Sequence, residues 1–279
     1  MSVASPHMKK NSATHSPRAK KSLGQHFLRR EDICHRIAAL IAPGAQDRII
    51  EIGPGPGALT RAIEAAPHAR LLLLEKDRHW AAERQRLGGP NTQAVLTDAL
   101  KFAWQRITPQ EPWKVIGNLP YNVASPLIWD IVSCSTGWQR AAFMVQKEVG
   151  QRLAAQPGTG HYGALSVWVQ SYARPRMEFV VGPGAFSPPP KVDSAVLSFE
   201  PLPAHDRPEH PKLLSRLLRV CFQQRRKQLG GIFRRAALPG LEKSLHDAGI
   251  DPALRPEALS CSDFQRIAAF WASQLDNKA

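Results

Sequence analysis

The feature that most constrains the fold of this chain is an alternation, over residues 47–146, of short apolar runs with segments of helical periodicity. The apolar runs are rich in Ile, Leu and Val without regular polar alternation, which is typical of strands buried on both faces. Strands separated by helices predict an α/β fold with a parallel sheet covered on both sides. Ser125 is expected to cap one helix, with Pro126 at its first position. The expected strands lie at 47–53, 69–77, 92–100, 112–120 and 140–146, and the expected helices at 58–66 and 125–133.

The pattern changes near residue 178, where two further strands are expected at 178–182 and 192–200. The segment that joins them is too rich in proline for a crossover helix, so we expect an antiparallel pair. A proline-rich linker follows at 201–211, and from residue 212 apolar residues recur at helical intervals. The α/β part is therefore followed by a small all-helical part.

Three regions are expected. Residues 1–18 mix Ser, Pro, Lys and His without periodicity, which indicates a disordered basic arm. Residues 19–201 form the α/β domain and residues 202–279 the helical domain. The 43% of apolar residues in the chain is enough to fill a core of this size.

The sequence also predicts the compartment and the state of the cysteines. It has no apolar run near the roughly 20 residues of a membrane span, and its basic start lacks the apolar segment of a signal peptide. We therefore expect a cytoplasmic protein that does not enter a membrane. Buried free thiols are expected rather than disulfides or a metal site, because the cysteines form no C-x-x-C pair and have no His at ligand spacing. They are Cys34, Cys134, Cys221 and Cys261.

The positive charge of the chain is unevenly placed. The net charge is +14, and two clusters without any acidic residue hold 15 of the 37 Lys and Arg residues. Such clusters in a chain of pI near 10.1 predict contacts with the phosphates of a nucleic acid, with attraction to a membrane surface as the lesser alternative. The clusters are Lys9, Lys10, Arg18, Lys20, Lys21, Arg29 and Arg30, and Lys212, Arg216, Arg219, Arg225, Arg226, Lys227, Arg234 and Arg235.

A glycine-rich turn follows the first expected strand, in the stretch EIGPGPGALT at 51–60. Gly53, Gly55 and Gly57 let the backbone approach a ligand closely at the start of a helix. Glu75 ends the next strand, where an acid can accept hydrogen bonds from both hydroxyls of a ribose. The alternative is that these glycines only allow a tight turn and bind no ligand.

Two features separate this turn from a dinucleotide site. The glycines are spaced G-x-G-x-G, which lacks the spacing that seats a pyrophosphate. Asp98 ends the third expected strand, where a carboxylate can accept from an exocyclic amine, although a surface turn or helix cap is its alternative. A ribose acid with an amine acceptor and no phosphate site describes an adenosine pocket, and S-adenosylmethionine fits it.

The stretch GNLPYN at 117–122 carries no acid, base or thiol. It suits methylation of adenine N6, a poor nucleophile that must become pyramidal before it attacks. The side-chain oxygen of Asn118 and the carbonyl of Leu119 can accept hydrogen bonds from the two N–H groups of this amine. Pro120 holds Leu119 in an extended conformation. Tyr121 offers a face on which an extruded base can stack, worth about 1–3 kcal/mol. A turn without chemistry is the alternative.

These segments closely resemble the bacterial dimethyladenosine transferase family, which acts on small-subunit ribosomal RNA. The likeness runs from about Lys20 through Glu200 and continues more loosely through the helical tail. The motifs are KKSLGQHFL (20–28), EIGPGPGALT (51–60), LLEKD (73–77), TDAL (97–100), GNLPYNVASPL (117–127), MVQKEV (144–149), YGALSV (162–167) and FSPPPKVDSAV (186–196).

The resemblance implies a Rossmann-like seven-stranded methyltransferase sheet with its last strand antiparallel, followed by a helical RNA-binding domain. It implies transfer of methyl groups from S-adenosylmethionine to the N6 amines of two adjacent adenosines near the 3′ end of 16S rRNA. The partner would be the small ribosomal subunit, with no metal, and we expect a monomer. The cofactor residues implied are His26, Leu28, Gly53, Glu75, Asp98 and Asn118.

Further roles come from the same resemblance. Phe186 would be a second aromatic wall around the target base, with a core aromatic beside a hairpin as the alternative. Arg225, Arg226 and Lys227 lie in a basic segment that faces ribosomal RNA in the family. The family has QNF where this chain has Gln25-His26-Phe27, so a contact through the His26 backbone is expected to survive better than one through its side chain.

Three other functions are weighed against this one. The sister group that methylates large-subunit rRNA and confers antibiotic resistance shares the fold, but usually has isoleucine where Leu119 stands. A nicotinamide-dependent oxidoreductase is disfavoured by the glycine spacing. A non-catalytic RNA-binding assembly factor is disfavoured by the intact residues Asn118, Pro120 and Tyr121.

Overall fold

The computed structural model describes residues 25–276, so the basic arm expected at 1–18 lies outside the described residues. Within this range the main sheet has seven strands in the order β4-β3-β2-β5-β6-β9-β7, and a second sheet pairs β1 with β8. The strands are β1 Phe27–Leu28, β2 Arg48–Ile52, β3 Arg70–Glu75, β4 Thr92–Leu96, β5 Trp113–Asn118, β6 Trp138–Gln146, β7 Ala173–Val181, β8 Phe186–Ser187 and β9 Ser194–Pro201.

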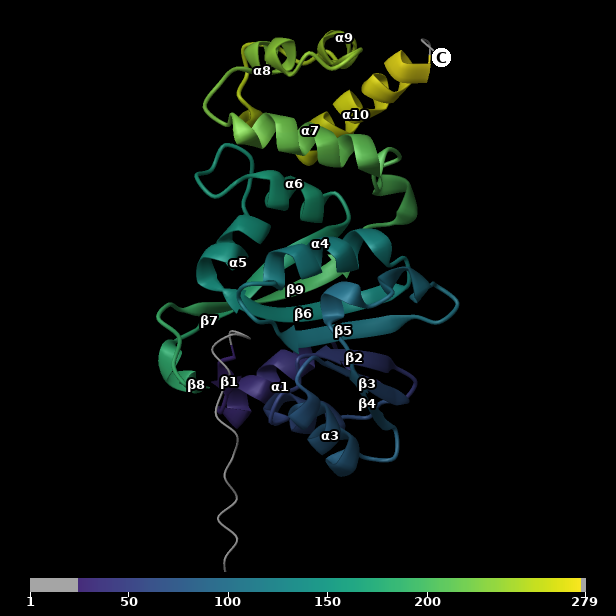
Figure 1. The fold of residues 1–279 in the computed structure, drawn as a ribbon, viewed down its shortest axis with the longest axis vertical. Coiled ribbons are helices and arrows are strands. Elements are labelled where there is room, and N and C mark those ends of the chain that lie inside the picture. Colours follow the sequence, from purple (N-terminus) through teal and green to yellow (C-terminus); the bar gives the residue numbers. More distant parts are fainter. Residues whose placement is uncertain (1–24, 277–279) are drawn as a thin grey trace, which may run out of the picture.

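Helices cover both faces of the main sheet, as the continuous apolar strands require. Figure 1 shows α4, α5 and α6 on one side of the sheet and α1 and α3 on the other. Alternate residues of β2 face the two layers: Ile50 and Ile52 pack in one core with α4 and α6, and Ile49 packs in the other with α1 and α2. The helices are α1 Glu31–Leu40, α2 Ala58–Glu64, α3 Arg78–Leu87, α4 Ala124–Cys134, α5 Lys147–Leu153, α6 Ala164–Gln170, α7 Pro211–Gln223, α8 Leu229–Ala236, α9 Leu241–Asp247 and α10 Cys261–Asp276.

The strand directions confirm the expected sheet. β2 to β6 pair in parallel, and β9 runs antiparallel to both of its neighbours, β6 and β7. The antiparallel pair expected around 178–200 is therefore confirmed. β7 begins earlier than expected, at Ala173, because pairing with β9 extends to Pro201.

The small sheet was not expected from the sequence. β1 and β8 are two residues each, with Phe27 opposite Ser187 and Leu28 opposite Phe186. A pair this short leaves no periodicity to detect. This pairing holds the segment around residue 26 against the carboxyl end of β5, where Asn118 Nδ2 donates to the His26 carbonyl.

Two local expectations were wrong. α4 begins at Ala124 with Val123 as its N-cap residue, so Ser125 is not the cap. Pro126 is still tolerated, because N–H groups in the first turn have no partner within the helix. β4 ends at Leu96, before Asp98, because the Asp98 side chain instead accepts from Leu100 N and caps the short 3₁₀ helix η2 (Ala99–Lys101).

One apolar core runs from the sheet through α4 and α6 into the C-terminal helices, including Trp168, Leu217 and Trp271. No helix within residues 25–276 is long and apolar enough to cross a bilayer. All four cysteines are free, but only Cys34 and Cys221 are buried. Cys134 is exposed at the end of α4 and Cys261 is partly buried, so the expectation of burial fails at both.

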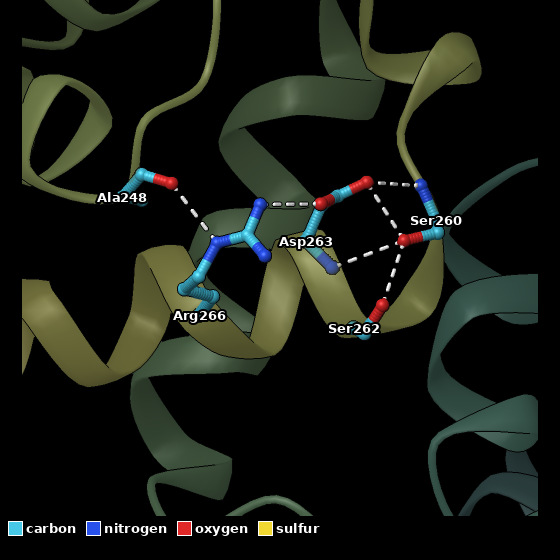
Figure 2. Close-up of polar contacts among 5 residues, drawn as sticks. All are labelled: Ala248, Ser260, Ser262, Asp263 and Arg266. Carbon is cyan, nitrogen blue, oxygen red and sulfur yellow. Dashed lines mark hydrogen bonds and ion pairs between the residues drawn. The ribbon is translucent and has the colours of Figure 1, made fainter.

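The start of α10 is fixed by the network drawn in Figure 2. Ser260 Oγ accepts from Asp263 N at 3.2 Å, and Asp263 Oδ2 accepts from Ser260 N at 3.0 Å, which together make a capping box. Arg266 donates to Asp263 Oδ1 and to the Ala248 carbonyl just after α9. The box thus joins α10 to α9.

Glu51 carries a buried carboxyl group beneath the glycine-rich turn. It lies in β2 and is 1% exposed, and its Oε2 has no hydrogen-bond partner among the described residues. Burial raises the pKa of Glu51 to about 8, although the nearby Arg84 guanidinium acts in the opposite direction. The charged form of this group therefore destabilises the folded state.

Replacing Glu51 by glutamine is expected to stabilise the protein increasingly as pH rises from about 4.5 to about 8. A carboxyl whose pKa is higher in the folded state contributes its full stability below the unfolded value, near 4.5. It loses that stability progressively from there until pH has risen through the folded value of about 8. At pH 9 the free energy of unfolding of the variant should exceed that of the natural protein by about 2–4 kcal/mol, with little difference at pH 4. Denaturant unfolding at several pH values measures this, and parallel pH profiles would contradict it.

Candidate active site

A cavity opens at the carboxyl edge of the parallel strands, where the strand order reverses. β2 is followed by α2 on one face and β5 by α4 on the other, which leaves a crevice between the two loops. Ligands of open α/β sheets bind at such a switch point. The cavity is lined from strand ends and from the segment entering β1: Gln25, His26, Phe27, Ile52, Gly53, Gly55, Leu74, Glu75, Lys76, Thr97, Asp98, Ala99, Leu100, Asn118, Leu119, Pro120, Tyr121, Asn122, Val123 and Leu127.

The glycine-rich turn adopts a backbone that other residues avoid. Gly55 and Gly57 have φ of +50° and +83°, in the left-handed region. A Cβ added to Gly57 would lie 1.9 Å from Arg84 Nη1, and one added to Gly55 would lie 3.0 Å from the Phe27 ring. A side chain at Gly57 would require Arg84 to move, one at Gly55 would press on Phe27, and the backbone of Gly53 and Gly55 borders the cavity.

Glu75 is held by that turn. Its Oε2 accepts from Gly55 N at 3.0 Å and its Oε1 from Asp77 N at 2.8 Å. Burial raises the pKa of Glu75, and these backbone donors oppose the rise. Since a carboxylate has four lone pairs, these bonds leave it able to accept from a ligand hydroxyl.

Asp98 also lines the cavity, just after β4, the strand that pairs with β3. Its Oδ2 is 2.8 Å from Lys76 Nζ, and its Oδ1 accepts from Leu100 N at 3.1 Å. The hydrogen bond from Lys76 lowers the pKa of Asp98. Asp98 is therefore both the cap weighed in the sequence and a cavity carboxylate, with Lys76 as its counter-ion.

Asn118 ends β5 with its side-chain amide already oriented. Its Nδ2 donates to the carbonyl of His26 at 3.0 Å, which leaves Oδ1 as the free acceptor end of the amide. Leu119 N donates to Met144 O at 3.0 Å, extending the β5–β6 pairing by one residue. The carbonyl of Pro120 then accepts from Ala124 N, so the turn leads directly into α4.

Tyr121 is held on two sides. Its hydroxyl shares a hydrogen bond of 2.7 Å with Ser194 Oγ at the start of β9. The His26 ring stacks on it, with centroids 5.5 Å apart and an interplanar angle of 27°. His26 is itself anchored because Nδ1 donates to the carbonyl of Pro188 at 2.9 Å.

Two predicted site residues lie outside the cavity. Leu28 and Phe186 are each 5% exposed, face each other across the β1–β8 pair, and pack in the core with α1 and α2. Phe186 thus occupies the core position that the sequence left open as its alternative. The roles predicted for both residues remain predictions.

The three predicted RNA contacts follow α7, away from the cavity. Arg226 and Lys227 are exposed. Arg225 is half-buried and forms an ion pair of 2.6 Å with Glu257. Among residues 25–276 there is no group of three or more His, Cys, Asp or Glu side chains placed to hold a metal ion.

Lys76, Thr97 and Gln25 line the cavity but were not predicted from the sequence. Lys76 and Thr97 adjoin predicted acids, so proximity to Glu75 and Asp98 could have found them. Gln25 lines the cavity because the β1–β8 pairing, which begins two residues later, holds this segment there, and nothing in the sequence predicted that pairing.

The fold and the site define the class of Rossmann-like methyltransferases. The sheet has seven strands with one antiparallel strand, and a glycine-rich turn, an acid and an amide lie at its carboxyl edge. The sequence model described as ribosomal RNA adenine dimethylase matches residues 16–273. The chain belongs to this family, and it is an enzyme that dimethylates adenine in ribosomal RNA.

Relatives and solved structures agree with this assignment. The chain is 58% identical over 253 residues to ribosomal RNA small subunit methyltransferase A of Nitratidesulfovibrio vulgaris, covering 89% of this chain and 94% of the relative. It is 41% identical to the protein of the same name in Pseudomonas aeruginosa, covering 90% and 94%. A dimethyladenosine transferase from Plasmodium falciparum superposes with a TM-score of 0.72 at 23% identity, covering 89% and 98%. The 23S rRNA methyltransferase ErmE superposes with 0.63 at 24% identity, covering 88% and 99%. These two structures support the fold.

Proposed function

We propose that this enzyme transfers methyl groups from S-adenosylmethionine to the N6 amines of two adjacent adenosines near the 3′ end of small-subunit (16S) ribosomal RNA. The observation that carries the proposal is the Asn118 amide, fixed by the His26 carbonyl with its oxygen free at the edge of the cavity. The names of the similar bacterial proteins support the small subunit as the substrate.

The cavity fits S-adenosylmethionine by its donors and acceptors. Glu75 would accept from the ribose hydroxyls, and the backbone of Gly53 and Gly55 borders the same space. Asp98 would accept from the adenine amine of the cofactor. When bound, S-adenosylmethionine would supply an electrophilic methyl group.

The chain's own residues would then activate and hold the target base. Asn118 Oδ1 and the Leu119 carbonyl would accept hydrogen bonds from the two N6–H groups. These hydrogen bonds are stronger to an amine that is becoming positive than to a planar one. Tyr121, whose ring is fixed by Ser194 and His26, would stack on the base after it leaves the RNA stack. We propose that the enzyme acts as a monomer in the cytoplasm.

The test is transfer of labelled methyl groups to purified small subunits that lack the modification, followed by mapping of the methylated bases. We expect two adjacent N6,N6-dimethyladenosines in 16S rRNA and none in large subunits assayed in parallel. In the absence of RNA, S-adenosylhomocysteine should raise the melting temperature and NAD should not. Methylation of the large subunit alone would replace the proposal by the activity of the sister group.

A further inference from the structure

The turn between α7 and α8 contains an arginine with three internal partners. Arg225 Nε donates to Glu257 Oε2 at 2.6 Å, Nη1 donates to the Gly160 carbonyl at 2.8 Å, and Nη2 donates to the Thr159 carbonyl at 3.1 Å. Each nitrogen of the guanidinium group thus has an acceptor within the protein. Such multidentate contacts fix geometry as well as charge.

These partners belong to two different parts of the molecule. Gly160 and Thr159 lie in the 154–163 connection between α5 and α6, which belongs to the α/β part, and Glu257 lies in the 3₁₀ helix η6 (Pro256–Ala258) before α10. The connection is also bonded directly to η6, because Gly158 N donates to the Glu257 carbonyl at 2.7 Å. In Figure 1 the α5–α6 connection and the α7–α8 turn lie on the same side of the molecule.

A buried tyrosine anchors the far end of the same connection. Tyr162 is fully buried, its hydroxyl donates to the Leu259 carbonyl at 2.9 Å, and its ring packs edge-on to Phe222 of α7. The 154–163 connection is therefore held at one end by Tyr162 in the core. Arg225 holds its exposed middle.

Arg226 and Lys227 differ from Arg225 in being exposed. They can therefore reach a phosphate without breaking the bonds seen within the protein. For Arg225 to do the same, it would have to leave Glu257, whose carboxylate already balances its charge.

We propose that Arg225 is a positioning residue that clamps the helical part to the α5–α6 connection, and that it sets the spacing between the RNA-facing cations and the methyl-transfer cavity. The inference rests on the proposed function. A target adenosine delivered by RNA docked on α7 and α8 must reach Asn118, and misplacement by about 1 Å can lower a rate on the order of 100-fold.

The test compares Arg225→Ala with Arg226→Ala, the same change one residue along the chain. Loss of the clamp should speed hydrogen exchange in the 154–163 peptide of the free protein in Arg225→Ala but leave it unchanged in Arg226→Ala. In binding to small subunits, Arg226→Ala should reduce the slope of log K against log salt by about one, and Arg225→Ala should leave that slope unchanged. Arg225→Ala should slow methylation of the subunits by about 10- to 100-fold with unchanged affinity for S-adenosylhomocysteine.

Arg225→Lys keeps the charge but cannot replace three directed donors, so its 154–163 exchange should resemble that of Arg225→Ala. Exchange and rate like those of the natural protein in Arg225→Lys would overturn the proposal, because charge alone would then suffice. A lowered salt slope in Arg225→Ala with unchanged 154–163 exchange would overturn it in favour of a phosphate contact. Hydrogen exchange needs no RNA, so it tests the clamp even if small subunits prove not to be the substrate.

Discussion

Replacing Asn118 by alanine is expected to lower the rate of methyl transfer by about 10²–10³, equivalent to about 3–4 kcal/mol in the activation free energy. The amide oxygen is an acceptor that gains strength as the target amine becomes positive, so its loss falls on the transition state. The His26 carbonyl, which now accepts from Asn118 Nδ2, would lose that partner as well.

The measurement is single-turnover transfer to small subunits, with S-adenosylhomocysteine affinity determined separately. The rate should fall far more than the affinity. Asn91→Ala is the matched control, because Asn91 is exposed and lies at the opposite end of the sheet, where its carbonyl pairs with Leu71 N at the start of β3. Undiminished transfer by Asn118→Ala would remove Asn118 from the mechanism.

Replacing Glu75 by alanine is expected to weaken binding of the cofactor by about 100-fold. The change removes both proposed ribose acceptors and leaves Gly55 N and Asp77 N without their carboxylate partner. Buried donors left without a partner cost about 1–3 kcal/mol each, which would also loosen the glycine-rich turn.

Calorimetric titration with S-adenosylhomocysteine measures this effect. Glu75→Gln keeps one acceptor oxygen, so its affinity should fall between those of the natural protein and Glu75→Ala, and the exposed Glu209→Ala should bind normally. Equal affinity in all four proteins would show that Glu75 does not contact the ribose.

Much of the site could be predicted because it lies where strands end. Glu75 and Asn118 terminate apolar runs that any parallel sheet must bury, and the carboxyl ends of parallel strands meet at one edge. The glycine-rich turn was recognisable for the same reason. That this turn lies beside Asn118 follows from the pairing of β2 with β5, which only the structure shows.

Other contacts could not be predicted because their partners are distant in sequence. His26 bonds to Pro188 across 162 residues and stacks on Tyr121, and both contacts depend on a two-residue pairing with no periodicity. In the sequence Arg225 is one of several cations in a basic segment. Its bonds to Glu257 and to the carbonyls of Thr159 and Gly160 distinguish it from Arg226.

The sequence by itself determined the strand and helix alternation, the antiparallel final strand, the family and the residues at the strand ends, because periodicity and motif spacing are local properties of the chain. The tertiary structure decided which predicted residues share a cavity and which are buried elsewhere, as with Phe186 in the core. It also decided the partners of Asp98 and Arg225. These depend on how distant segments close on one another, and a side chain's local sequence does not record what it will meet there.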